Sequence, residues 1–332
     1  DGLTLGAITA VGGNAAVTST TGNILLGAVS AAGNTVTLAA SAGAIADNNA
    51  GVNNLVATTA NLSAGGAIGT AADPLESTIA ALSASATAGG VFLVETAAAT
   101  LTLSSVTAGG AGSNVVISNT AVGGDIVATS VTATDDAITL SAATAGGDIS
   151  LGLVTAGSAG TVTLTAGAGG TGSIIDTDGD VDVVAGVATL SAQQNVGVAG
   201  TEIDTTVGSL DATTAAGEIA VIESDGLTLG TITAVGGNAS VASATGNILV
   251  GSVTAAGNVV TLAATGGALT DNNGAAVNVT AASTTLTAGT SLASSGDPLD
   301  TNVAAITSAT AANGGVFLSE TDAVTIGVVS SS

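Results

Sequence analysis

The chain has 332 residues and a formal net charge of −24, because it contains 24 Asp and Glu residues and no Lys, Arg or His. Binding to nucleic acids or anionic membranes depends on Lys and Arg, and stacking on bases depends on aromatic side chains, of which only two phenylalanines are present. The composition therefore predicts neither nucleic acid nor a membrane surface as a partner, and the countercharge must come from solvent cations or another molecule.

The rest of the composition constrains the fold class and the location. No run of apolar residues approaches the roughly 18 that a membrane-spanning helix needs, so membrane insertion is not expected. Val, Ile and Thr are abundant, which argues against intrinsic disorder, and the absence of Trp, Tyr and Met predicts a narrow aliphatic core. The lack of cysteine fits an extracellular protein without disulfides, although a cytosolic protein can also lack cysteine.

The first segment of the sequence recurs far downstream. Residues 1–14 read DGLTLGAITAVGGN, residues 225–238 read DGLTLGTITAVGGN, and 37 of the first 50 residues recur 224 positions further on. The substitutions exchange one small or aliphatic residue for another. We therefore divide the chain into a first long repeat, residues 1–224, and a partial second copy, residues 225–332, continuous with the first. Because the second copy breaks off partway, we expect the sequence to be a piece of a longer protein.

A shorter period lies within the long repeat. An aliphatic residue, in most cases with a glycine two positions before it, recurs at intervals of 21 to 25 residues within each set below. The aliphatic positions are Ile24, Ile45, Ile68 and Val91, then Ile126, Ile149, Ile174, Val196 and Ile219, and in the second copy Ile248, Leu269, Leu292 and Val316. The gap of 35 residues between Val91 and Ile126 is longer than one period, so one turn of the repeat is left unplaced.

Short alternating runs lie between these positions and predict strands. Examples are TVTLAA at 35–40, AITLSA at 137–142, TVTLTA at 161–166 and VVTLAA at 259–264. Short strands at this spacing indicate an all-β fold, a parallel β-helix (β-solenoid) of roughly 15 coils in which each period stacks on the one before. A sandwich or a propeller is the alternative, but a unit of this length holds only two or three strands, too few for a propeller blade.

One segment carries signals for a helix. In DPLESTIAAL at 73–82, Asp73 could cap the helix, Pro74 could occupy its first position and Glu76 its third. The matching position to Glu76 in the second copy is Asp300. We favour a loop that leads into a strand, since both prolines of the chain then lie at corners outside the β ladder.

These features together resemble the repeat regions of filamentous haemagglutinin-like large bacterial exoproteins. The resemblance rests on the coil cadence, on the phrases N-I-L-x-G-x-V and D-G-L-T-L-G, and on the D-P-L…GG-V-F-L segment at 73–93 and 297–318, and it covers essentially the whole chain. It implies a right-handed β-helical shaft, secretion across a bacterial outer membrane, and a role in adhesion or cell-surface structure. The lack of Lys and Arg departs from most members of that family.

The acidic segment 174–184 is the strongest candidate for a metal site. It contains four alternating aspartates, Asp176, Asp178, Asp180 and Asp182. In a strand all four side chains point to one face, and oxygen ligands of this kind suit calcium. Same-face residues in a flat strand lie about 6.8 Å apart, too far for all four to bind one ion, so chelation requires a bend, for which Gly179 is suited. The alternative is a solvated acidic strand face without an ion.

Asparagines recur near the expected turns, and we expect their side chains to complete turns and to stack between coils. They are Asn14, Asn23, Asn34, Asn48 and Asn49 in the first copy, and Asn247, Asn258, Asn272 and Asn273 in the second.

The sequence gives little support for catalysis. Without His, Lys or Cys, only carboxylates and hydroxyls remain as acid, base or nucleophile. We therefore predict a structural segment of an extracellular bacterial filament or surface fibre that carries out no catalysis and associates with itself, end to end or laterally. The alternatives are an adhesin stalk that presents a binding domain outside this segment, and a calcium-dependent binding module. Calcium is the one cofactor that the residues suggest.

Overall fold

The computed structural model describes all 332 residues and consists of strands joined by turns and short loops. It is a right-handed parallel β-helix of about 15 turns, which confirms the predicted fold class. The chain divides into two compact units, Asp1–Gly172 and Ser173–Ser332. No helix in the chain has both the length and the apolar character that crossing a lipid bilayer requires.

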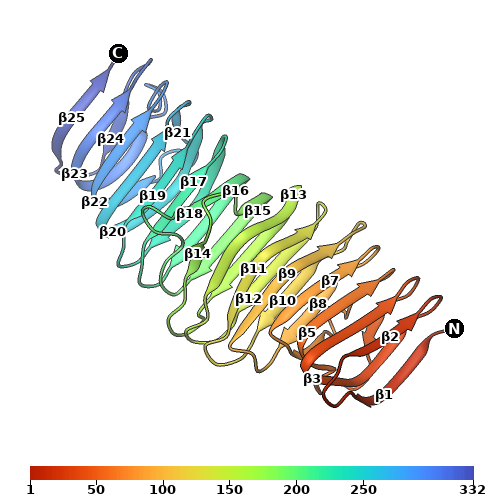
Figure 1. Ribbon diagram of the computed structural model, residues 1–332. Helices are drawn as coiled ribbons and strands as arrows, with labels where there is room; N and C mark the ends of the chain where they lie inside the picture. The colour runs from red at the N-terminus through yellow and green to blue at the C-terminus, as the bar shows by residue number, and fades with distance from the viewer. The chain divides into compact units, whose positions relative to one another are not determined.

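The first unit contains the strands β1 to β13, which lie side by side in successive coils (Figure 1). The strands are β1 (Leu3–Thr9), β2 (Ala15–Ser19), β3 (Ile24–Ala40), β4 (Ile45–Asp47), β5 (Leu55–Ala64), β6 (Leu75–Thr78), β7 (Ala81–Ala86), β8 (Val91–Glu95), β9 (Thr100–Ala108), β10 (Val115–Asn119), β11 (Asp125–Ala133), β12 (Ala137–Ala142) and β13 (Ile149–Ala166).

Aliphatic residues of successive coils form one column through the first unit. Each residue of the column pairs with the next in parallel register, and the column runs through Leu3, Ile24, Ile45, Ile68, Val91, Val115, Ile138 and Val162. The turn that the sequence left unplaced after Val91 passes through Val115, and Ile126 pairs with Leu101 and Ile149 on another face of the coil. The 35-residue gap is therefore one ordinary coil plus a change of face.

Alternation within each strand builds the core. In β12 the side chains of Ile138, Leu140 and Ala142 are fully buried, while the residues between them are partly exposed. The paired segment of β13 places Leu164 beside Leu140 in the same inward orientation. Burying a Leu or Ile side chain contributes about 1.5–3 kcal/mol, so a column of like residues supplies stability to every coil.

Close approach of neighbouring coils explains why glycine recurs two residues before the aliphatic position. A Cβ placed on Gly43 would lie 2.6 Å from the backbone nitrogen of Asn23 in the preceding coil. In the second copy a Cβ on Gly267 would lie 2.6 Å from the backbone nitrogen of Asn247. Real Cβ atoms do not approach backbone atoms this closely, so only glycine fits at this corner.

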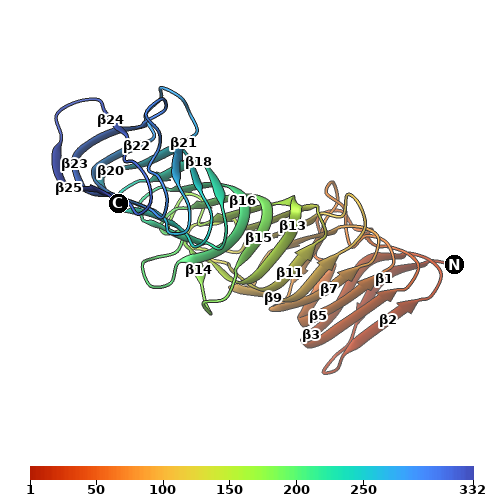
Figure 2. The same cartoon turned by 90° about the horizontal axis from the view of Figure 1, so that it is seen from above.

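The second unit contains the strands β14 to β25. They are β14 (Ile174–Asp176), β15 (Val183–Ala192), β16 (Ile203–Thr214), β17 (Ile219–Glu223), β18 (Leu227–Ala234), β19 (Ala239–Ser243), β20 (Ile248–Ala264), β21 (Leu269–Asp271), β22 (Val279–Ala288), β23 (Leu299–Ala311), β24 (Leu318–Glu320) and β25 (Thr325–Ser331). Figure 2 shows β16, β18 and β20 next to one another, and their residues pair in parallel register. The start of the second copy, residue 225, lies inside this unit, and β16 and β18 pair across it.

The second copy repeats the register of the first. Leu227 pairs with Ile248, and Ile248 pairs with Leu269, as Leu3 pairs with Ile24 and Ile24 with Ile45. Each residue of the second set lies 224 positions after its counterpart, so the two copies fold in the same way.

The segment 73–82 forms the predicted loop and strand. Pro74 directly precedes β6, and Leu75, Ser77 and Ile79 are buried while the residues between them are more exposed. Burial with a period of two excludes a helix here, because a helix buries residues three or four apart.

Asparagine side chains join neighbouring coils, as predicted. Oδ1 of Asn14 accepts a hydrogen bond from the backbone N–H of Thr35 at 3.0 Å, and Oδ1 of Asn23 accepts one from Ala44 at 2.9 Å. These bonds satisfy backbone donors at the corners, where the strand ladder is interrupted.

Candidate metal centre

The acidic segment forms a turn between two strands of the second unit. β14 ends at Asp176 and β15 begins at Val183. Oδ1 of Asp176 accepts hydrogen bonds from the backbone N–H groups of Asp178 at 2.9 Å and Gly179 at 3.2 Å. Gly179 has a φ of 79°, a left-handed conformation that favours glycine. The bend required for chelation therefore lies at Gly179.

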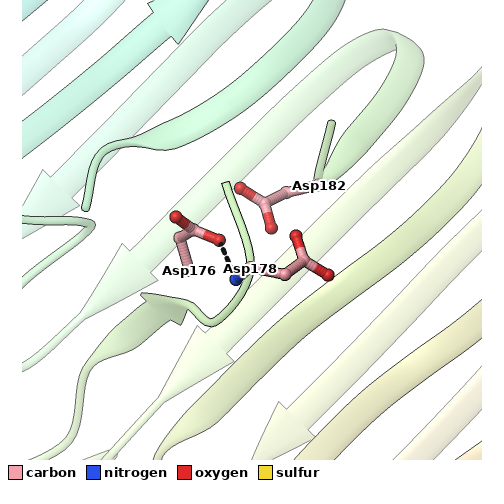
Figure 3. A group of neighbouring side chains, drawn as sticks. All are labelled: Asp176, Asp178 and Asp182. Atoms are coloured by element: carbon pink, nitrogen blue, oxygen red, sulfur yellow. Dashed lines mark hydrogen bonds between the residues drawn. The ribbon is translucent and has the colours of Figure 1, made fainter. Parts of the chain in front are cut away.

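The turn brings three of the four predicted aspartates together. One carboxylate oxygen each of Asp176, Asp178 and Asp182 can be chosen so that all three lie within 4.8 Å of one another. Figure 3 shows the carboxylate of Asp182 turned toward the other two carboxylates. Asp176 and Asp182 are buried, whereas Asp178 is exposed, so the group reaches from the interior of the coil to the solvent.

Asp180 lies outside this group. Its backbone N–H donates to Oδ1 of Asp178 at 3.0 Å, and its own side chain is exposed. The turn at Gly179 interrupts the strand alternation that would have placed all four carboxylates on one face.

Asp182 is held in place by the next coil. Its Oδ2 accepts a hydrogen bond from the backbone N–H of Asp204 at 2.8 Å, and its own N–H donates to the carbonyl oxygen of Asp204 at 2.8 Å. Its side chain is 0 % exposed, and Oδ1 is buried without a hydrogen-bond partner. A buried polar atom without a partner costs roughly 1–3 kcal/mol, and more when it is charged.

The electrostatics of this group oppose a negative charge on Asp182. Burial raises the pKa of Asp182 to about 8, the hydrogen bond from Asp204 opposes that rise, and the negative charges of Asp176, Asp204 and Asp178 add to it. Burial also raises the pKa of Asp204, with further contributions from Asp176, Glu202, Asp178 and Asp180. No Lys, Arg or His exists in the chain to neutralise these charges.

A shallow hollow gives solvent access to the turn. Its walls are Asp176, Thr177, Asp178 and Gly179 on one side and Gly200 and Thr201 from the next coil on the other. Two carboxylates of the group thus line a surface that a small solvated cation can reach.

Buried glutamates form a second class of acidic position, one that the sequence patterns did not reveal. Oε2 of Glu95 accepts hydrogen bonds from Ser77 Oγ at 2.8 Å and from the N–H of Ile79 at 2.7 Å. Its Oε1 accepts from the N–H groups of Ala97 and Ala98, both at 2.9 Å. The carboxylate is an acceptor for a corner of the backbone, and it is 0 % exposed.

The same corner recurs twice in the second unit. Oε2 of Glu223 accepts from Thr205 Oγ1 at 2.8 Å, and Oε2 of Glu320 accepts from Thr301 Oγ1 at 2.8 Å. The sequence signal is a Ser or Thr that precedes the glutamate by 18 or 19 residues, which is close to one coil.

Paired carboxylates recur at a further corner of both copies. Desolvation raises the pKa of Asp73, and so do the charge of Asp47 and a hydrogen bond with it. The pKa of Asp297 is raised for the same reasons, with Asp271 as the neighbour. Both pairs belong to corners organised by a buried asparagine, Asn54 in one and Asn278 in the other.

Together the fold and these contacts define a β-solenoid repeat protein in which several acidic side chains lie at corners of the coils. Comparison of the chain with protein-family models, curated proteins and solved structures finds no match. Chemically, the corners around Glu95 and Glu223 supply acceptors to backbone donors. The group of Asp176, Asp178 and Asp182 differs, because it concentrates negative charge and leaves a buried oxygen unpartnered.

Proposed function

We propose that the chain is a structural segment of an extracellular bacterial filament or surface fibre, and that its role is to supply length without catalysis. The observation that carries this proposal is the duplication of a buried structural corner. The side-chain nitrogen of Asn54 lies 2.6 Å from Asp47 Oδ1 and 3.0 Å from Asn49 Oδ1. In the second copy, Asn278 lies 2.6 Å from Asp271 Oδ1 and 3.0 Å from Asn273 Oδ1.

Duplication of this kind preserves contacts that hold coils together. Each coil stacks on its neighbour through backbone pairing and an aliphatic column, so an additional copy can extend the stack without new interactions. The sequence resemblance to the repeat regions of filamentous haemagglutinin-like exoproteins supports the same role. The absence of Lys and Arg leaves no site for trypsin-like proteases, which suits an exposed location at the bacterial surface.

Electron microscopy of the purified chain tests this role. We expect uniform filaments with an axial repeat, because the proposed partner is another copy of the chain. Isolated particles at every protein concentration would contradict self-assembly and leave the role of a stalk that presents a separate binding domain.

A longer chain tests the contribution of the repeat to length. Inserting one further copy of residues 1–224 adds about ten coils, which at about 4.8 Å per coil lengthens the particle by about 50 Å. A particle that becomes wider rather than longer would contradict the proposal.

A further inference from the structure

We propose that Asp176, Asp178 and Asp182 bind one divalent cation, and that calcium is the ion that fits them. The inference stands independently of the proposed function, because it rests on the turn between β14 and β15 alone. Two observations carry it: three carboxylate oxygens lie within 4.8 Å of one another, and Oδ1 of the fully buried Asp182 has no hydrogen-bond partner.

The carboxylate that carries this unpartnered oxygen faces the other two carboxylates. Oδ2 of Asp182 is occupied by the backbone N–H of Asp204 at 2.8 Å, which fixes the side chain. Figure 3 shows the fixed carboxylate directed toward Asp176 and Asp178. A buried charge is stable only when it is paired or coordinates a metal, and the carboxylates that Asp182 faces cannot pair with it.

The composition of the chain leaves two ways to neutralise this group. Because Lys, Arg and His are absent, the compensating charge must be a proton or an ion from solution. A proton on Asp182 would neutralise that residue but would leave the charges of Asp176 and Asp178 close together. A divalent cation neutralises most of the charge of all three carboxylates at once, which favours the ion.

The spacing and the ligand type favour calcium. Calcium takes carboxylate and other oxygen ligands at about 2.3–2.6 Å, so two ligands on opposite sides of the ion lie about 5 Å apart. The upper limit of 4.8 Å between the three oxygens is compatible with that geometry. Magnesium holds its ligands at about 2.0–2.1 Å in a strict octahedron and keeps several of its waters, so it fits less well.

The turn is already shaped for an ion before one binds. Hydrogen bonds to Oδ1 of Asp176 and to Oδ1 of Asp178 fix both side chains within the turn. The exposed Asp178 and the hollow beside it provide the path from solvent. An ion bound here would link the turn to the coil of Asp204 through Asp182.

Equilibrium dialysis of the full chain against radioactive calcium at about 150 mM NaCl tests the site, because this salt concentration screens diffuse attraction to the acidic surface. We expect one saturable site per chain. The Asp182→Asn variant removes one charged ligand with little change of shape, and we expect it to weaken calcium binding about tenfold or more. The matched control Asp180→Asn makes the same change within the turn, at an exposed side chain outside the group, and should bind within about twofold of the unchanged chain.

Three results would overturn the proposal. They are the absence of saturable binding, an equal loss in Asp180→Asn and Asp182→Asn, and equal displacement of calcium by magnesium at the same concentration. The first would indicate that a proton neutralises Asp182, the second that the acidic surface attracts calcium diffusely, and the third that the ion assignment is wrong.

Thermal denaturation followed by far-ultraviolet circular dichroism checks that each variant is folded and measures its stability. We expect calcium to raise the midpoint of the unchanged chain and of Asp180→Asn, and to raise the midpoint of Asp182→Asn by less at the same calcium concentration. Should Asp182→Asn fail to fold, Asp178→Asn gives the same test at an exposed ligand, where the loss of a charge does not disturb the core. Retention of full calcium binding by Asp178→Asn would also overturn the three-ligand site.

Discussion

The side-chain nitrogen of Asn54 lies 2.6 Å from Oδ1 of Asp47, in a corner from which solvent is fully excluded at Asn54. The same nitrogen donates to the carbonyl oxygens of Leu26 and Gly27 at 3.1 Å, and Oδ1 of Asn54 accepts from the N–H of Glu76 at 2.9 Å. The residues before, at and after this corner belong to three successive coils. One buried amide thus connects a coil to both of its neighbours.

Replacing this amide should destabilise the coils around it. The Asn54→Ala variant removes the hydrogen bonds that this side chain makes to the carbonyl of Leu26, the N–H of Glu76 and the carboxylate of Asp47, so we expect a loss of about 2–4 kcal/mol in the free energy of unfolding. Thermal denaturation measures the loss, and hydrogen exchange of the Glu76 amide locates it. The control Asn34→Ala removes an exposed bond from Asn34 to Ala32 O and should cost less than about 0.5 kcal/mol. Equal losses in the two variants would contradict the role of Asn54.

A neutral side chain should not replace Glu95. Every partner of its carboxylate is a donor, namely Ser77 Oγ and the N–H groups of Ile79, Ala97 and Ala98. The Glu95→Gln variant turns one acceptor oxygen into an NH₂ group that faces these donors, so we expect a loss of about 2–4 kcal/mol in the free energy of unfolding. The control Glu218→Gln changes a carboxylate that accepts one long bond, 3.4 Å from the N–H of Ala199. Unfolding of the two variants at the same denaturant concentration would show that Glu95 is not a structural acceptor.

The fold could largely be predicted from the sequence because the features that specify each coil are local. A coil is specified by a glycine too close to the preceding coil for a Cβ, by an aliphatic residue two positions later and by the alternating strands that follow. The turn between Val91 and Ile126 could not be placed because several faces of a coil use the same aliphatic residues, and spacing alone does not say which face a residue joins.

The candidate metal site could be predicted only in part, because the path of the chain decides which carboxylates come together. Alternation in the sequence gave four aspartates, but the left-handed turn at Gly179 directs Asp180 away from the other three. The unpartnered oxygen of Asp182 depends on the position of Asp204, 22 residues further along the chain. The buried Glu95 was missed because its donors come from the preceding coil as well as from its own turn.

The pH dependence of stability should reveal the buried Asp182. Its pKa is about 8 in the folded chain, against 3.8 for an ordinary aspartate, and the charges that face it are those of Asp176, Asp178 and Asp204. A carboxyl with a raised pKa favours the folded state fully below its unfolded pKa, and this contribution is lost as the pH rises toward 8. In metal-free buffer we therefore expect the unchanged chain to lose up to about 1.4 kcal/mol per pH unit relative to Asp182→Asn between about pH 4 and pH 8.

Thermal midpoints measured at intervals across that pH range give the comparison. The other carboxyls with raised pKa values, such as Glu223, change stability in the same direction in both proteins and cancel in the difference. Parallel curves for the two proteins would show that the charge on Asp182 is not suppressed. Saturating calcium should remove the difference in slope, because the ion replaces the proton.

The close approach of coils at the glycine corner makes a final prediction. A Cβ on Gly267 would lie 2.6 Å from the backbone nitrogen of Asn247, and neither backbone can move without breaking the ladder of its coil. We expect Gly267→Ala to reduce the free energy of unfolding by about 1–3 kcal/mol. Gly296 is exposed and has open space around the position of a Cβ, so Gly296→Ala should change stability by less than about 0.5 kcal/mol. Circular dichroism during thermal denaturation measures both variants. A Gly267→Ala protein as stable as Gly296→Ala would mean that the coils can separate at this corner. The recurrence of glycine there would then need another explanation.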